Sequence, residues 1–205
     1  MIRGAMRAED WDRKWRDELG EPRAEPNRFL VAEVEGIRPG RALDLACGAG
    51  RNAVWLAEQG WEVTGVDFSE VGLEHARRLA QSRGVEVEWV LADVLEWEPP
   101  AGAFDLVAVL YLQLPADERY ELLSRASSAL APGGTLLFVA HDVRNLTEGW
   151  GGPKSAAVLC PPEGVASDLT GLVIDRAERV TRLVEDEDGE HRAIDTLVKA
   201  SRSSA

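Results

Sequence analysis

The stretch Asp44-Leu-Ala-Cys-Gly-Ala-Gly-Arg-Asn-Ala53 decides the fold of this 205-residue chain. Gly48 and Gly50 stand where a short apolar run, residues 41–46, gives way to a helical pattern over residues 51–59. Glycine lets bare backbone approach a ligand closely at such a strand-to-helix turn. The sequence therefore predicts a ligand-binding loop between a strand and a helix.

A second strand and an acidic residue follow this loop. The helix is expected to stop at Gly60, because glycine is common just after a helix C-terminus. Residues 61–66 then form a strand pattern that ends at Asp67, seventeen residues after Gly50. An acid at that point is placed to accept hydrogen bonds from ribose hydroxyls. Loop, helix and strand-end acid together predict a cofactor that contains a ribose.

Strand and helix patterns alternate along the chain, with short connections between them. Strands are expected at residues 41–46, 61–66, 85–91, 104–110, 134–141, 172–183 and 192–200. Helices are expected at residues 8–19, 26–36, 51–59, 69–82, 115–130 and 162–168. This alternation is typical of βαβ units, and an Asp-Gly turn signal joins the last two strands as an antiparallel hairpin. The predicted fold class is α/β: a Rossmann-like, doubly wound, seven-stranded, mostly parallel sheet with a reversed C-terminal hairpin strand.

No linker interrupts the sequence, so we expect residues 1–205 to form a single domain. Trp11, Trp15 and Leu19 share one face of the first helix. The expected parts are an N-terminal helical lid (1–36), a cofactor-binding core (37–143), a Gly- and Pro-rich substrate lid (144–170) and a closing β-hairpin (171–200).

Charge and composition argue against several classes of partner. The chain carries 36 acidic and 23 basic residues, a net charge of −13, and no cluster of Lys or Arg. The electrostatic field of this negative charge repels phosphate backbones and anionic lipid. We therefore expect neither nucleic acid nor a membrane as partner. The N-terminus has no signal-peptide pattern, and two cysteines are too few for a disulfide framework or a structural zinc site. We expect a cytoplasmic protein that acts on a small molecule and holds no metal.

Two cofactor classes use a loop of this shape. Read as Gly-x-Gly-x-x-Ala, residues 48–53 nearly match a nicotinamide fingerprint. Asp44, however, lies inside the first strand, four residues before Gly48, where its carboxylate would stand close to a pyrophosphate. A cofactor with a cationic amino group suits that carboxylate better, which favours S-adenosylmethionine over NAD.

Residues 41–67 resemble motif I and its partner strand in the class I S-adenosylmethionine-dependent methyltransferases. Residues 91–94 are similar to the family's adenine-side motif, and residues 131–137 to its loop entering strand five. Gly50-Arg-Asn52 and Trp11-Asp12-x-x-Trp15 look like the small single-domain tellurite-resistance and thiopurine-type enzymes. Ala46 departs from the family, which most often has glycine there.

The resemblance implies roles for ten residues around the cofactor. The methionine end would be held by Asp44 and by the loop of Cys47, Gly48, Gly50 and Asn52; the ribose by Asp67; and the adenine side by Phe68, Asp93, Val94 and Leu110. Two of these carboxylates have structural alternatives: Asp44 as a cap of the following helix, and Asp93 as a cap of a turn. Cys47 is expected to pack beside the loop and not to act as a nucleophile.

Candidate acceptor-side residues come from four other places in the chain. His141 ends the fifth strand, and His141-Asp142 is a candidate general base, the alternative being a histidine hydrogen-bonded at a strand end. Tyr111, Trp11 and Trp15 can line the acceptor pocket or serve only in packing. Trp150 lies among glycines, which favours a mobile lid residue.

The sequence therefore predicts an S-adenosylmethionine-dependent methyltransferase that acts on a small-molecule acceptor by in-line displacement. Two rivals remain open at this point: a protein that binds S-adenosylmethionine without transferring its methyl group, as a sensor or partner subunit, and a nicotinamide oxidoreductase. Asp44 argues against the second rival.

Overall fold

A computed structural model describes residues 8–17, 25–186 and 189–204. Its centre is a seven-stranded sheet in the order β3-β2-β1-β4-β5-β7-β6. The strands are β1 (Arg41–Leu45), β2 (Glu62–Asp67), β3 (Glu88–Leu91), β4 (Phe104–Leu110), β5 (Leu130–His141), β6 (Val173–Asp186) and β7 (Gly189–Ser201). Strands β1 to β5 pair in parallel, and β7 runs antiparallel to both of its neighbours. The predicted fold class is confirmed.

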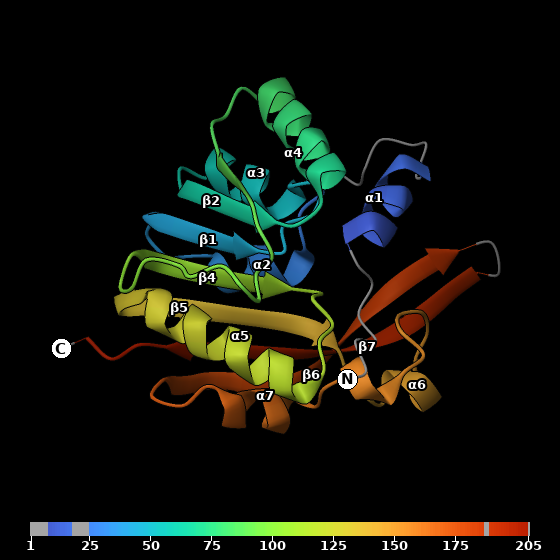
Figure 1. Ribbon diagram of the computed structural model, residues 1–205. Helices are drawn as coiled ribbons and strands as arrows, with labels where there is room; N and C mark the ends of the chain where they lie inside the picture. Colours follow the sequence, from blue (N-terminus) through green and yellow to red (C-terminus); the bar gives the residue numbers. More distant parts are fainter. Residues whose placement is uncertain (1–7, 18–24, 187–188, 205) are drawn as a thin grey trace.

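Helices cover both faces of this sheet (Figure 1). The α-helices are α1 (Ala8–Asp17), α2 (Arg28–Val34), α3 (Arg51–Glu58), α4 (Glu70–Arg83), α5 (Ala116–Ala129), α6 (Asn145–Glu148) and α7 (Pro162–Asp168), with a 3-10 turn η1 at Ala156–Val158. Apolar side chains of α5 and α7 fill one core, and those of α2 and α3 fill the other. No helix within the described residues is long and apolar enough to cross a membrane. Leu19 of the expected first helix lies outside the described residues.

Several strand boundaries differ from the sequence prediction, and the second strand, for example, begins at Glu62 instead of residue 61. The first strand ends one residue early, because Ala46 turns into the left-handed region at φ 58°. The third begins at Glu88 instead of residue 85, since continuing its register would set Glu86 beside Glu62, two like charges. It lies at the sheet edge, as its charges suggest. The fifth begins at Leu130, because residues 131–134 form an irregularity within the strand.

The hairpin of β6 and β7 is longer than predicted and reaches past the end of the sheet. His141, the last residue of β5, pairs with Asp195 of β7, which in turn pairs with Val180 of β6. The hairpin beyond these positions therefore projects over the carboxyl edge of the parallel strands. In Figure 1 its free end lies on the same side of the molecule as α1 and α6. This edge is where open α/β sheets bind ligands.

Candidate functional site

The glycine loop makes a tight passage from β1 into α3. Its three left-handed residues are Ala46, Gly48 and Gly50, with φ of 58°, 55° and 80°. A Cβ added at Gly50 would stand 2.6 Å from Ala76 Cβ and 2.7 Å from Trp89 Cη2. Glycine at position 50 is thus required by the packing of α4 and β3 against the loop. Ala46 adopts its left-handed conformation at a cost of about 1–2 kcal/mol.

Asp44 places a carboxylate in the core directly beneath this loop. The residue is 1% exposed, and no described residue donates a hydrogen bond to its Oδ2. Burial raises the pKa of Asp44 to about 7, an effect that the charge of Arg51 and the N–H of Ala53 oppose. Because Ala53 lies in the first turn of α3, the helix-capping alternative is realised in part. The remaining unpartnered oxygen fits a cationic ligand group.

Asp67 ties the end of β2 to the loop. Its Oδ2 accepts from Gly48 N at 2.7 Å, and its Oδ1 accepts from Ser69 N at 2.8 Å. Burial raises the pKa of Asp67 in spite of these two hydrogen bonds. Each carboxylate oxygen has a second lone pair, so the group retains capacity to accept from hydroxyls. Asp67, the residue predicted to bind the ribose, therefore lies next to the glycine loop.

The other predicted cofactor residues differ in how the protein itself uses them. Asn52 Oδ1 accepts from Asn27 N at 2.8 Å and so fixes the start of α2. Asp93 is exposed, and its Oδ1 accepts from Leu95 N at 2.9 Å, the turn-capping alternative. Phe68 is half-buried, while Val94 and Leu110 are core residues on opposite faces of the sheet. Cys47 is buried, and burial raises the pKa of its thiol, in line with a packing role.

Helix α1 packs Trp15 against the glycine loop. A Cβ at Gly48 would stand 3.0 Å from Trp15 Cζ2, and one at Gly72 3.1 Å from Trp15 Nε1. The rings of Trp11 and Trp15 lie 6.1 Å apart. Asp12 fixes the helix in place, since its Oδ1 accepts from Ser69 Oγ at 2.6 Å. The structure thus brings α1 to the cofactor loop rather than to the cluster around His141.

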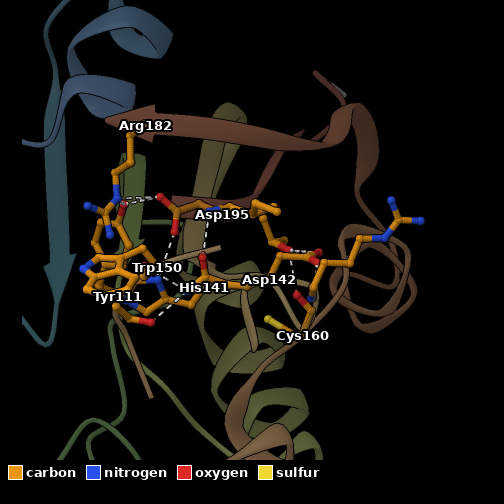
Figure 2. Close-up of polar contacts among 12 residues, drawn as sticks. Tyr111, His141, Asp142, Trp150, Cys160, Arg182 and Asp195 are labelled. Atoms are coloured by element: carbon orange, nitrogen blue, oxygen red, sulfur yellow. Dashed lines mark hydrogen bonds and ion pairs between the residues drawn. The ribbon is translucent and has the colours of Figure 1, made fainter. Parts of the chain in front are cut away.

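A second group of polar side chains gathers where β4 and β5 end and the longer hairpin of β6 and β7 runs past them. Figure 2 shows Tyr111, His141 and Arg182 converging on Asp195, which is fully buried. Asp195 Oδ1 lies 3.0 Å from His141 Nδ1, and its Oδ2 accepts from Tyr111 Oη at 2.7 Å and from Arg182 Nε at 2.8 Å. The rings of Tyr111 and His141 are 5.1 Å apart. Burial, followed by the charge of Asp195, raises the pKa of Tyr111.

Asp142 is not the partner of His141, although the two are adjacent in sequence. Its buried carboxylate accepts from Arg144 N at 2.8 Å and lies 3.0 Å from Arg179 Nε. Figure 2 shows it on the far side of His141 from Arg182. His141, the candidate general base, is therefore paired with Asp195.

The segment after α6 covers the His141 ring. A Cβ added at Gly152 would stand 2.9 Å from His141 Cδ2. Asn145 fixes this segment, because its Nδ2 donates to the carbonyls of Trp150 and Gly151 at 3.2 and 2.9 Å, while its Oδ1 accepts from Ile194 N at 2.8 Å. The ring of Trp150, 41% exposed, stacks on that of His191 at 3.9 Å.

Sequence reasoning missed Asp195, Arg182 and Asn145. One signal for Asp195 was present: it is a carboxylate in the otherwise apolar or neutral run Ala193 to Val198. Its partner could be found only from the pairing register of β5 and β7, which brings residues 54 positions apart into contact.

Known proteins share both the motif region and the architecture. A family model described as a methyltransferase domain matches residues 42–134. Demethylmenaquinone methyltransferase of Thermus thermophilus is 42% identical over 101 residues, which make up 48% of this chain and 46% of that protein. The chain thus spans about half the length of this curated relative.

Two solved structures show how far the fold extends. A structure from work on the conversion of a disulfide bond into a thioacetal group during echinomycin biosynthesis has a TM-score of 0.77 and 22% identity, covering 96% of this chain and 92% of that one. TehB from Haemophilus influenzae has a TM-score of 0.71 and 17% identity, covering 86% and 62%. A methyltransferase-domain model thus matches the region of the glycine loop and the central strands, a methyltransferase relative matches about half of the chain, and both solved structures share the fold.

Proposed function

We propose that this chain transfers the methyl group of S-adenosylmethionine to a small-molecule acceptor. The observation that carries the proposal is the buried Oδ2 of Asp44, which lacks a donor among the described residues and lies beneath the glycine loop. An isolated buried carboxylate is unfavourable unless a cation or hydrogen-bond donor meets it. The ammonium of the methionine moiety is such a group.

The other residues proposed for the cofactor lie at or near the same carboxyl edge of the sheet. Backbone N–H groups of the Gly48–Gly50 loop would hold the methionine carboxylate end, beside Cys47 and Asn52. Asp67, at the end of β2, would bind the ribose hydroxyls. Phe68, Asp93, Val94 and Leu110 are proposed for the adenine side, Asp93 through its exposed carboxylate. When bound, S-adenosylmethionine supplies an electrophilic methyl group on a sulfonium, whose thioether is the leaving group.

The acceptor site is proposed at the group of Tyr111, His141, Arg182 and Asp195. It lies at the same carboxyl edge as the cofactor loop, because β4 and β5 follow β1 in the sheet. Holding the acceptor in line with the methyl group, away from water, would supply most of the rate enhancement. His141 is the candidate base for an acceptor that must lose a proton.

A small acceptor is favoured over a macromolecule. We propose the segment 144–170 as a lid, because a Cβ at Gly152 would stand 2.9 Å from His141 Cδ2, although its last part, α7, packs against the core beside α5. The hairpin 171–200 is proposed as a wall, because its end lies on this side of the molecule (Figure 1). Helix α1 of the proposed lid 1–36 packs Trp15 against the glycine loop of the proposed core 37–143. The net charge of −13 disfavours nucleic acid and anionic membranes, and a cytoplasmic location accords with it. The Thermus relative is named for demethylmenaquinone, a small molecule.

The test is calorimetry with S-adenosylmethionine, combined with measurement of S-adenosylhomocysteine released over a panel of phenols, amines, thiols and metalloid oxyanions. Binding and release together support methyl transfer, whereas binding without release from any acceptor supports the sensor alternative. Binding of NADH in place of S-adenosylmethionine overturns both. Asp44→Ala should abolish binding, while Glu121→Ala, on the exposed face of α5, should not change it.

A further inference from the structure

Asp195 has the contacts expected of a carboxylate that orients a catalytic histidine. It is fully buried, and its two oxygens are used by three side chains: Tyr111 just after β4, His141 of β5 and Arg182 of β6. Arg182 Nε also donates to Tyr111 Oη at 3.0 Å, so the guanidinium stands against both groups. The guanidinium of Arg182 thus offsets the loss of water around the buried carboxylate, which accepts hydrogen bonds from both Arg182 and Tyr111.

An ionised carboxylate can only accept hydrogen bonds. His141 Nδ1, 3.0 Å from Asp195 Oδ1, must therefore carry the ring proton, and in the neutral ring Nε2 is left with its lone pair. The contact fixes both the tautomer and the orientation of the imidazole. It also argues against Tyr111 as a base, since its hydroxyl proton is directed to Asp195 Oδ2.

We propose that Asp195 is a positioning residue that holds His141 as a general base through Nε2, and that the methyl acceptor of this enzyme is a hydroxyl group. The inference rests on the proposed methyl transfer and names its substrate class. A hydroxyl is a poor nucleophile until its proton is removed, whereas a thiolate or carboxylate attacks without a base. The guanidinium of Arg182 next to the base disfavours a cationic ammonium acceptor.

The proposed step balances in atoms and charge. The hydroxyl proton passes to His141 Nε2 as the oxygen lone pair forms the new O–C bond and the S–C bond breaks, its electron pair remaining on sulfur. The imidazolium that results is stabilised by Asp195, to which its Nδ1–H still donates, and it then releases its Nε2 proton to solvent. No oxidant, reductant or metal takes part in this step.

The first test needs neither an acceptor nor a variant of Asp195. The chain has only three histidines, His75, His141 and His191, so long-range proton–nitrogen NMR can resolve every imidazole. His75→Gln and His191→Gln assign the signals by elimination. We expect the neutral His141 ring to carry its proton on Nδ1, the tautomer that is less common in water. A proton on Nε2 would overturn the positioning role.

The second test compares acceptors of matched shape, using catechol and phenol against benzenedithiol and thiophenol. Asp195→Asn should lower kcat for the hydroxyl acceptors about 10- to 100-fold with little change in KM, and should leave the thiols unaffected. Asp175→Asn, an exposed carboxylate on the same hairpin, is the matched control and should change neither. Equal losses for hydroxyl and thiol acceptors would refute the inference.

The proposed methyl transfer and the proposed hydroxyl acceptor can fail separately. Should the wild-type protein bind S-adenosylmethionine yet methylate no compound of any class, the proposed transfer fails, whatever the tautomer of His141. If it methylates only thiols, the transfer stands and the hydroxyl assignment is wrong. His141→Gln provides a further check, because loss of the base should reduce hydroxyl turnover about 10²- to 10⁴-fold.

Discussion

Replacing Asp44 by asparagine should make the protein more stable, and more so at high pH. The carboxyl has its pKa raised by burial from 3.8 to about 7, so folding favours its protonated form. A group whose folded pKa exceeds its unfolded value contributes stability at low pH, and that contribution is lost as pH rises through the folded value. The amide of the variant does not titrate and has no such dependence. The stability of Asp44→Asn relative to the wild type should therefore increase from pH 4 to pH 8.

The size of this gain follows from the two pKa values. Above pH 8, the wild type loses about 4 kcal/mol of unfolding free energy by burying the ionised Asp44. Less than about 2 kcal/mol of this loss is already present at pH 5. The stability gap between Asp44→Asn and wild type should thus widen by about 2–3 kcal/mol from pH 5 to pH 8. For a domain of this length that is a relative change in Tm of about 5–10 °C.

Urea unfolding at the two pH values, without cofactor, measures the gap directly. Any fixed cost of the amide cancels, because only the change of the gap with pH is compared. Glu121→Gln makes the same carboxylate-to-amide exchange at an exposed position and should show no widening. A gap for Asp44→Asn that stays constant from pH 5 to pH 8 would refute the reasoning from burial.

Three further outcomes are expected. Gly50→Ala should cost about 2–4 kcal/mol in urea unfolding, because it adds a clash to backbone strain, whereas Gly84→Ala, with φ +67° and open space, should cost about 1 kcal/mol. Asp67→Ala should weaken S-adenosylmethionine binding by about 1–3 kcal/mol, and unchanged affinity in calorimetry would remove it from the ribose site. Asn145→Ala frees the carbonyls of residues 150–151, so hydrogen exchange there should rise at least about tenfold; protection equal to that of the wild type would show that the segment is fixed by other contacts.

The proximity of the residues proposed for the cofactor could be predicted because the information for it is local. Asp44, Gly48 and Gly50 lie within one strand and one turn, and Asp67 ends the very next strand, so spacing alone brings them together. Parallel strands joined by short helices leave little freedom in how these four meet.

The group of side chains proposed for the acceptor depends on a strand register that no local pattern encodes. His141 was found because it ends a strand, but its partner was sought in the adjacent Asp142, whose side chain lies elsewhere. Asp195 became visible only once β7 was aligned against β5. The Asp-Gly turn signal bears on the pairing of β6 with β7, whereas the register of β7 against β5 follows from how the assembled sheet buries its two faces, which the sequence of β7 alone does not give.

The antiparallel pairing of β7 with β5 has a consequence for how such a site can change over generations. Side chains on one face of a strand repeat every two residues, so a slip of two residues would keep every apolar side chain facing inward. It would, however, set Ala193 or Leu197 opposite His141 in place of Asp195. Two residues gained or lost in the hairpin turn could then remove the proposed partner of His141 and favour acceptors that are already nucleophilic. The glycine loop, three strands away from β7, would be untouched.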